Sequence, residues 1–168
     1  MVSGVTLEFS RGEFGWYCDL SLPSWAPFRK SGAELSAFVV NGAESPTPDQ
    51  LAALEDLVLR EKDVFDSAFS ALRAYYDKMR PKYLPFLARC EMDVDVVMPP
   101  APDDATFASL YDFQSIVVQD ESKNGRAFLS FLMPCEWEVE HGIGIVAHGT
   151  DIVDIDYISH VTQWSPRR

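Results

Sequence analysis

The stretch from residue 47 to residue 79 constrains the fold more than any other part of the sequence. It opens with Thr47-Pro48-Asp49-Gln50, which puts a hydroxyl side chain at the N-cap position, proline at the first helical position and glutamine at the third. Apolar residues then follow helical spacing: Leu51, Leu54, Val58, Phe65, Phe69, Leu72, Tyr76 and Met79. Pro81 is expected to end the helix, because its ring and its missing N–H interrupt the hydrogen-bond ladder.

The predicted helix over residues 48–79 is long for a chain of 168 residues. At about 1.5 Å per residue, a continuous helix would extend roughly 48 Å. A break near Asp63 would satisfy the same apolar pattern with two shorter helices. The sequence therefore predicts either one long helix or two shorter ones.

Alternation of apolar and polar residues predicts strands on both sides of this helical stretch. Before it, residues 5–9 and 16–22 predict a hairpin that turns at Arg11-Gly12-Glu13, and residues 34–40 predict a third strand. Asn124-Gly125 is a strong turn signal in the later part of the chain. About four further strands are expected there: residues 113–120, 126–133, 143–148 and 152–158.

The order of these elements predicts the fold class. Three strands precede the helical stretch and about four follow it, so strands and helices are segregated along the chain. Such segregation is typical of α+β proteins. We expect a mainly antiparallel sheet that is covered on one face by one long helix or two shorter helices.

We expect a single domain over residues 1–168, because this length is close to the usual size of one domain. Residues 90–106 are rich in proline and acidic residues, which indicates a linker or a surface loop and not a domain boundary. No apolar run approaches about 18 residues, and no secretory signal is visible. Cys18, Cys90 and Cys135 lack the paired spacing of a zinc or redox motif. These features predict a cytoplasmic protein with reduced thiols and no membrane partner.

The negative charge is concentrated in the C-terminal part of the chain. The net charge is −12, and residues 90–168 hold 14 acidic and only 4 basic residues. A field of this sign repels nucleic acid and attracts cationic molecules. We therefore expect a cationic protein partner and no nucleic-acid partner.

The segment Cys135-Glu136-Trp137-Glu138-Val139-Glu140-His141-Gly142 is the most distinctive stretch of this acidic part, and His148 and His160 follow it. Carboxylates and imidazoles are the ingredients of a metal site or of a general acid–base pair. His141-Gly142 occupies the expected position of a hairpin turn. Cys135 is flanked by acidic residues, which raise the pKa of a thiol and disfavour a nucleophilic cysteine. The chain has no glycine-rich phosphate loop, no Gly-x-Ser-x-Gly elbow and no His-Glu-x-x-His pair.

The spacing of the three glutamates in this segment predicts a solvated face. In a strand, Glu136, Glu138 and Glu140 would point to the same side, with successive side chains about 6.6 Å apart. Trp137 and Val139 would then face the core. We expect these three carboxylates to be exposed and available to a partner.

The last predicted strand repeats this pattern. Asp154 and Asp156 alternate with Ile155 and Tyr157, so an acidic face again opposes an apolar one. Residues 135–156 contain six acidic residues and no lysine or arginine. The sequence therefore predicts one acidic C-terminal surface.

A widespread bacterial domain family of unknown biochemical function resembles this chain in the run Cys135-Glu136-Trp137-Glu138-Val139-Glu140-His141-Gly142-Ile143-Gly144-Ile145. The pattern of that family is Trp-acidic-x-Glu-His-Gly-aliphatic-Gly. The resemblance is closest between Phe128 and Asp154. Members of that family are companions of secreted or contact-delivered toxins, so the resemblance implies the role of an immunity protein. Many members have glycine after the final aliphatic strand, where this chain has Asp154-Ile155-Asp156. The resemblance implies no catalytic residue.

Two functions from different classes follow from these features. The first is an immunity or antitoxin protein, not an enzyme, which binds a cationic toxin domain through its acidic surface and needs no cofactor. Its expected partner-binding residues are Glu136, Glu138, Glu140, Asp151, Asp154 and Asp156. The alternative is a metal-dependent hydrolase that uses Glu138, Glu140 and His141 around a divalent ion.

Overall fold

The computed structural model describes residues 6–13, 15–30, 35–39 and 45–166 of the chain. Its centre is a sheet of seven strands that lie side by side in the order in which they occur in the sequence. The strands are β1 (Phe9–Gly12), β2 (Gly15–Leu20), β3 (Leu35–Val39), β4 (Ser115–Lys123), β5 (Arg126–Cys135), β6 (Glu138–His148) and β7 (Asp151–Tyr157). All neighbours pair antiparallel except β3 and β4, which are parallel.

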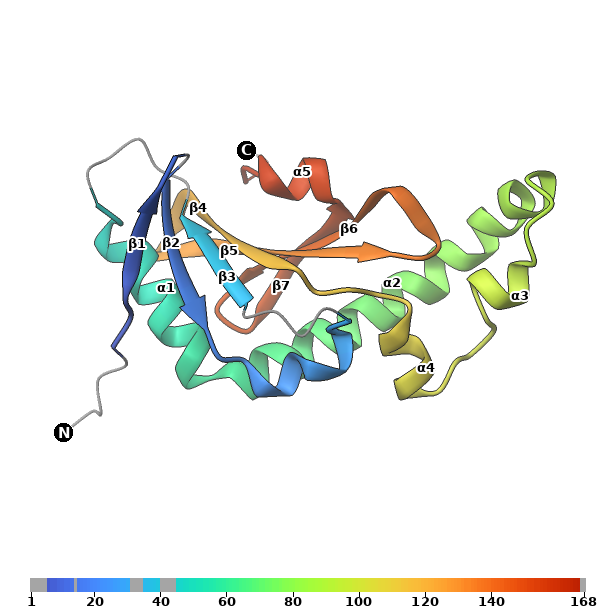
Figure 1. Cartoon of the computed structure of the whole chain (residues 1–168), viewed down its shortest axis with the longest axis horizontal. Helices are drawn as coiled ribbons and strands as arrows, with labels where there is room; N and C mark the ends of the chain where they lie inside the picture. The colour runs from blue at the N-terminus through green and yellow to red at the C-terminus, as the bar shows by residue number, and fades with distance from the viewer. Residues whose placement is uncertain (1–5, 14, 31–34, 40–44, 167–168) are drawn as a thin grey trace.

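The parallel pair explains where the helices lie in the chain. A parallel connection cannot be made by a short turn, and the crossover between β3 and β4 contains α1 (Pro48–Leu59), α2 (Glu61–Arg89), α3 (Val94–Val97) and α4 (Asp104–Ser109). Figure 1 shows α1 and α2 along one side of the sheet, and the short α5 (Ile158–Thr162) on the other side. The predicted α+β class, with a mainly antiparallel sheet and helices on one face, is confirmed.

The helical stretch consists of two helices, which settles the alternative that the sequence left open. The break lies at Arg60, three residues before the predicted position. The capping box at the start of α1 is confirmed: Thr47 Oγ1 accepts a hydrogen bond from the N–H of Gln50, and the Gln50 side chain accepts one from the N–H of Thr47. Each residue thereby satisfies a donor that the first helical turn leaves unpaired.

The predicted end of the helix at Pro81 is wrong, because α2 continues through Pro81 and Pro85 to Arg89. The two prolines are one helical turn apart on an exposed face, where water can hydrate the carbonyls that lose their N–H partners. Contacts on the opposite side hold the later turns in place. Leu87 is buried, and the Arg80 guanidinium donates to the carbonyl of Met98 at 2.7 Å.

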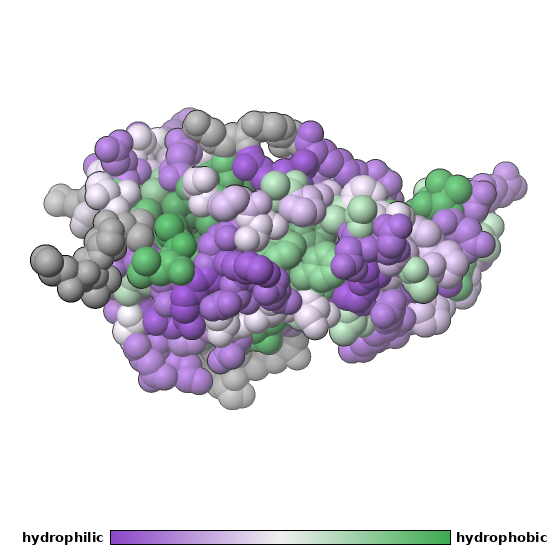
Figure 2. Space-filling model, turned by 90° about the horizontal axis from the view of Figure 1, so that it is seen from below, coloured by the Kyte–Doolittle hydropathy of each residue, from purple (hydrophilic) through white to green (hydrophobic). Residues whose placement is uncertain are grey.

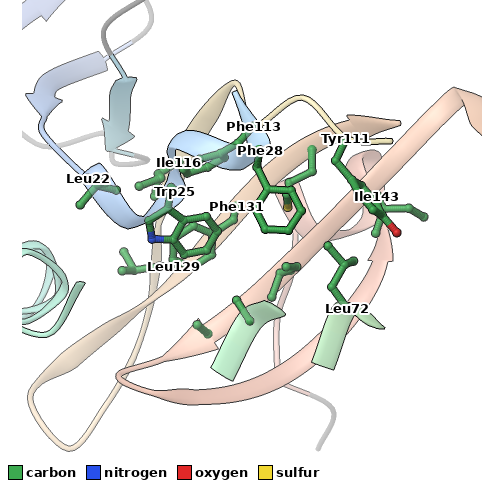
Figure 3. Packing of buried hydrophobic residues seen from close by; sticks show 14 of the residues in the cluster. Leu22, Trp25, Phe28, Leu72, Tyr111, Phe113, Ile116, Leu129, Phe131 and Ile143 are labelled. Atoms are coloured by element: carbon green, nitrogen blue, oxygen red, sulfur yellow. The ribbon is translucent and has the colours of Figure 1, made fainter. Parts of the chain in front are cut away.

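The core lies between the sheet and α2 and contains many aromatic side chains. Trp25, from the 3-10 helix η1 (Pro23–Phe28), stacks on Phe131 of β5 with ring centroids 4.8 Å apart and an interplanar angle of 6°. Figure 3 shows Trp25 and Phe28 against side chains from β4 and β5. Pro23 and Pro27 therefore belong to a short helix that supplies the core residues Trp25 and Phe28.

A smaller cluster lies on the other face of the sheet, under α5. Phe128, Val146 and Val161 are buried there, with Trp164 packed against them. The buried side chain of Gln119 donates to the carbonyl of Val161 at 2.9 Å. This contact fixes α5 to the sheet, since an unpaired buried amide would be costly.

The predicted strands agree with the observed ones except near some ends. The first hairpin turns after Gly12, so its first strand is later than the expected 5–9; residues 5, 34 and 40 lie outside the described part of the chain. The turn at Asn124-Gly125 is confirmed. The two residues have φ of 52° and 74°, and a two-residue hairpin loop of type I′ requires positive φ at both positions.

The predicted surface loop over 90–106 contains α3 and the start of α4. In the part of the chain that the structure describes, no helix has the length and apolar character needed to span a lipid bilayer. The single domain over residues 1–168 stays a prediction, which calorimetry can check by counting unfolding transitions.

Candidate functional site

A cleft of about 440 Å³ lies between the C-terminal end of α2, the turn that joins β5 to β6, and β7. The distinctive segment of the sequence, residues 136–141, forms one wall. Tyr83 and Phe86 of α2 form the opposite wall, and Tyr157 of β7 closes one side. The cleft therefore brings together residues that lie far apart in the sequence.

The backbone of this wall departs from a regular strand. Glu136 and Trp137 form the turn between β5 and β6, and Cys135 pairs with Glu138. The next pair is Met133 with Ile143, so the four residues 139–142 form an irregular bulge opposite the single residue 134. His141-Gly142 thus lies inside β6, and the prediction that it forms the hairpin turn is wrong.

Gly142 allows this bulge to pack closely. Its φ is +60°, a backbone angle that residues with a side chain rarely adopt. A Cβ atom there would lie 2.5 Å from Cδ1 of Ile158 and 3.1 Å from Cα of Pro134. A larger residue would push the bulge away from β5 and α5. The glycine therefore helps to determine where the residues before it point.

The bulge breaks the alternation on which the predicted orientations depended. Trp137 is buried as expected, with its ring 5.2 Å from that of Tyr83. Val139 was expected to face the core but is 80% exposed. Glu138 was expected to be solvated, but only 11% of its side chain is exposed. Both expectations were wrong because residues 136–142 do not form a continuous pleated strand.

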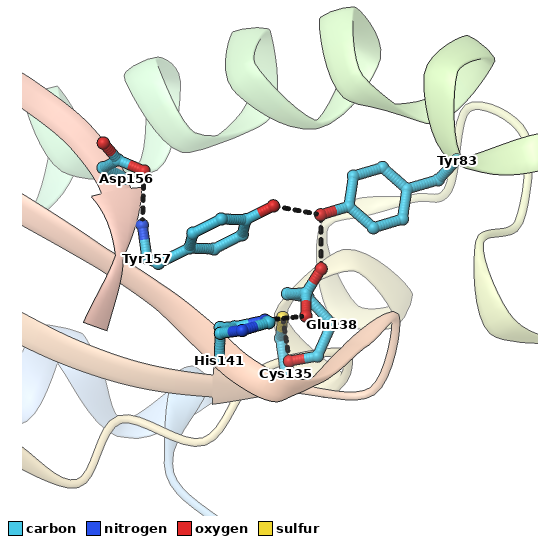
Figure 4. A network of polar contacts seen from close by, with 6 residues as sticks. All are labelled: Tyr83, Cys135, Glu138, His141, Asp156 and Tyr157. Carbon is cyan, nitrogen blue, oxygen red and sulfur yellow. Dashed lines mark hydrogen bonds and ion pairs between the residues drawn. The ribbon is translucent and has the colours of Figure 1, made fainter. Parts of the chain in front are cut away.

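Glu138 is the centre of a polar network in the cleft (Figure 4). The Tyr83 hydroxyl donates to Oε2 of Glu138, and Nδ1 of His141 lies 2.9 Å from Oε1. The Tyr83 and Tyr157 hydroxyl oxygens are 3.3 Å apart. The imidazole of His141 and the Tyr157 ring lie in contact, with centroids 4.7 Å apart. Side chains of α2, β6 and β7 thus meet in one network around Glu138.

Burial raises the pKa of Tyr83 in the cleft and of the neighbouring Cys135, so both groups stay protonated. Burial, followed by the hydrogen bond to Glu138, raises the pKa of Tyr83 far above its usual value, so its hydroxyl acts as a donor. Burial raises the pKa of Cys135 to about 12, and the charge of Glu138 adds to this. Cys135 is therefore unsuited to act as a thiolate nucleophile, as the flanking acidic residues predicted.

The two other glutamates of this segment differ from Glu138 in their surroundings. Glu136 forms an exposed ion pair with Lys30 at 2.5 Å. Glu140 is exposed and makes no hydrogen bond or ion pair with any described residue. The cleft therefore has one nearly buried carboxylate and two exposed ones at its rim.

Asp154 and Asp156 of β7 lie apart from the cleft, around a separate hollow beside α5. Oδ1 of Asp154 accepts from the N–H of Ile155, and Oδ2 accepts from Trp164. Asp156 accepts from the N–H of Tyr157 and contacts His160 at 3.1 Å. Both aspartates therefore bind groups of their own chain.

Asp151 is exposed at the other end of β7, where the hairpin from β6 turns. His148, at the end of β6, lies 3.0 Å from the carbonyl of Lys123. The six predicted partner-binding residues are thus divided among the cleft, the α5 side and the β6–β7 turn. They do not form the one acidic surface that the sequence predicted.

The proposed metal ligands come together only in part. Glu138 and His141 are in contact, whereas Glu140 contacts neither of them. Over residues 6–13, 15–30, 35–39 and 45–166, no group of three histidine, cysteine, aspartate or glutamate side chains has a geometry suited to a metal ion.

The residues on the α2 wall were missed by the sequence reasoning. Ending the helix at Pro81 removed Tyr83 and Phe86 from consideration. The apolar stripe could have revealed this wall, since Tyr83 and Leu87 continue the helical spacing of Tyr76 and Met79 beyond the proline.

Comparison with known proteins adds one finding. A family model described as a domain of unknown function (DUF6985) matches residues 6–161, which cover the whole sheet and α2. Comparison with curated proteins and with solved structures found no match.

Proposed function

The chain belongs to the DUF6985 family of domains of unknown function, and we propose that it is an immunity- or antitoxin-type protein that binds a cationic toxin domain at the cleft. The observation that carries this proposal is the combination of exposed apolar side chains and carboxylates around one hollow. The toxin-related role itself comes from the resemblance of residues 137–144 to proteins that accompany toxins.

The apolar part of the cleft supports a protein partner. Phe86 is 52% exposed, Met92 41% and Val139 80%, and all three line the cleft. Figure 2 shows apolar surface at the end of the molecule where α2 and α3 lie. Exposed large apolar residues that gather in one place are typical of surfaces that bind other proteins.

The charge of the cleft supports a cationic partner. Glu136, Glu138 and Glu140 line it, with Lys82 as its one lysine. Enzymes that act on nucleic acids or nucleotides need cationic sites, and a negative surface can occupy such a site in place of the substrate. Asp151, Asp154 and Asp156 have no part in this proposal, because they lie outside the cleft.

The alternative of a metal-dependent hydrolase has one supporting observation. The Glu138 carboxylate orients the His141 imidazole, and such pairs occur in general acid–base catalysis. Glu140 would have to join them to complete the predicted set. Elemental analysis of the purified protein separates the two proposals, since stoichiometric zinc or manganese would favour the hydrolase.

A binding measurement with the polypeptide encoded beside this chain in its native genome tests the proposal. Phe86→Ser should weaken binding at least tenfold, about 1.4 kcal/mol, because it removes an apolar anchor from the cleft. Leu59→Ser is the matched control, since Leu59 is 59% exposed on α1 and does not line the cleft. Calorimetry measures the affinities. The survival of cells that produce the partner measures whether the protein or its variant protects them.

Three results would oppose the proposal. The neighbouring polypeptide could fail to bind, the two serine variants could bind equally well, or the parent protein could bind without protecting the cells. A circular dichroism spectrum of each variant must first show that it folds like the parent.

A further inference from the structure

The cleft contains a nearly buried carboxylate that forms no ion pair with a lysine or arginine among the described residues. Among the described residues, the Glu138 carboxylate forms polar contacts with Tyr83 and His141, and His141 is charged only when it is protonated. Lys82 lines the cleft but forms no ion pair with Glu138. Carboxylates that are removed from water are usually paired with a cation, because the desolvation of an isolated charge is costly.

Glu138 lines the cleft and has acceptor capacity that its two carboxylate contacts do not use. An ionised carboxylate has about four lone-pair sites, of which Tyr83 and His141 use two. The exposed carboxylate of Glu140 adds negative charge at the rim. A cation that enters the cleft would therefore meet the carboxylate of Glu140 at the rim and that of Glu138 further inside.

Aromatic side chains surround this carboxylate. Tyr83, Phe86, Trp137 and Tyr157 all line the cleft, and the Tyr83 and Trp137 rings are in edge contact at 5.2 Å. Aromatic faces attract cations, and they attract the planar guanidinium of arginine more often than the ammonium of lysine. Arginine can also pair with a carboxylate through two parallel hydrogen bonds.

We propose that the cleft receives an arginine side chain of the protein partner, with its guanidinium at Glu138 and its aliphatic stem beside Phe86 and Val139. This inference rests on the proposed function, because it takes the cleft as the docking site for that partner. The volume of about 440 Å³ is within the range of sites that enclose a small group. The arginine neutralises the carboxylate, and the apolar side chains of Phe86 and Val139 shield the pair from water.

The direct test uses the whole chain and three blocked tripeptides that differ only at the central residue: Gly-Arg-Gly, Gly-Lys-Gly and Gly-citrulline-Gly. Citrulline keeps the shape of arginine but has no charge. We expect the arginine peptide at millimolar concentration to shift the NMR signals of Tyr83, Trp137 and His141. The lysine peptide should bind at least threefold more weakly, and the citrulline peptide should leave these signals unchanged.

A pair of variants then assigns the interaction to one carboxylate. Glu138→Gln should weaken binding of the arginine peptide at least tenfold. Glu55→Gln is the matched control, because it removes the same charge from an exposed position on α1, outside the cleft, and should leave the affinity unchanged. The comparison of arginine with citrulline needs only the parent protein, so it decides the proposal even if Glu138→Gln does not fold.

The outcomes separate this inference from the proposed function. Equal binding of the citrulline peptide, equal binding of the lysine peptide, or unchanged NMR signals with the arginine peptide would each overturn the arginine site. If the neighbouring polypeptide still binds in a manner that depends on Phe86, the proposed function stands and only the arginine site fails. If the arginine peptide binds but that polypeptide does not, the site stands and the proposed function fails.

Discussion

The indole Nε1 of Trp164 donates a hydrogen bond to Oδ2 of Asp154 at 3.1 Å, and this bond joins the segment after α5 to the edge strand β7. The other oxygen of Asp154 accepts from the N–H of Ile155 at 3.0 Å. Asp156 repeats this arrangement with Tyr157 and His160. Asp154 and Asp156 therefore accept hydrogen bonds from backbone N–H groups of β7. Without these acceptors, the N–H groups could pair with a strand of another molecule.

Asp154→Ala should lower the free energy of unfolding by about 1–2 kcal/mol, because it removes the acceptor for Trp164 and for Ile155. It should also increase self-association, since the N–H of Ile155 becomes available at the edge of the sheet. Urea denaturation and analytical ultracentrifugation measure the two effects. Asp151→Ala, on the same strand but without a side-chain hydrogen bond to a described residue, should change stability by less than about 0.5 kcal/mol. Equal effects of the two variants would argue against the capping role of Asp154.

Glu138 and Glu140 should respond differently to charge reversal. Glu138→Lys should destabilise the fold by about 1–3 kcal/mol, because Tyr83 loses its acceptor in a nearly buried site. Glu140→Lys should change stability by less than about 0.5 kcal/mol, since its side chain is exposed. Denaturant midpoints measure both. If Glu138→Lys were as stable as the parent, the network in Figure 4 would contribute little to folding.

Thr47→Ala should lower the free energy of unfolding by about 1 kcal/mol, because the N–H of Gln50 loses its side-chain acceptor at the start of α1. Chemical denaturation measures this change. Thr6→Ala provides the control, since Thr6 is exposed and lies before the first strand. A midpoint identical to that of the parent would mean that the capping box does not stabilise α1.

Tyr75 and Tyr76 of α2 should make the stability of the fold sensitive to alkali. Burial raises the pKa of Tyr75 and of Tyr76 from 10.0 to about 12. The unfolded chain then releases these phenolic protons at lower pH than the folded chain does, so deprotonation favours unfolding. Stability should be unaffected by these groups below about pH 10 and should fall between about pH 10 and pH 12.

Urea denaturation at successive pH values, together with phenolate absorbance, tests this expectation. Tyr76→Phe removes one of the two groups and should reduce the loss of stability in that pH window. A loss of the same size in the variant would assign the alkaline transition to other residues.

The three cysteines should differ in reactivity. All three are free in the structure, but only Cys90 is exposed, whereas Cys18 and Cys135 are buried. Burial also raises the pKa of Cys18, which lowers its thiolate fraction. Under native conditions, mass spectrometry after alkylation should show rapid modification of one thiol, and in denaturant it should show three. A mass two units lower, with one reactive thiol in denaturant, would instead indicate a disulfide.

The sequence alone determined the features that depend on neighbouring residues. The capping box at Thr47 and the turn at Asn124-Gly125 each need only a few consecutive residues, and both were predicted at the observed positions. The order of strands and helices was also correct, because hydrophobic periodicity reports which elements have an apolar face. The fold class follows from that order.

Only the tertiary structure decided which groups meet in the cleft. The passage of α2 through Pro81 depends on which side of the helix faces water, and that side is set by packing against distant residues. The burial of Glu138 depends on Tyr83, which is 55 residues away in the sequence. The bulge at residues 139–142 shifts the alternation of side chains, and no local pattern revealed it. At these positions orientation and burial are set by long-range contacts and by the bulge, which a regular spacing along the chain does not report.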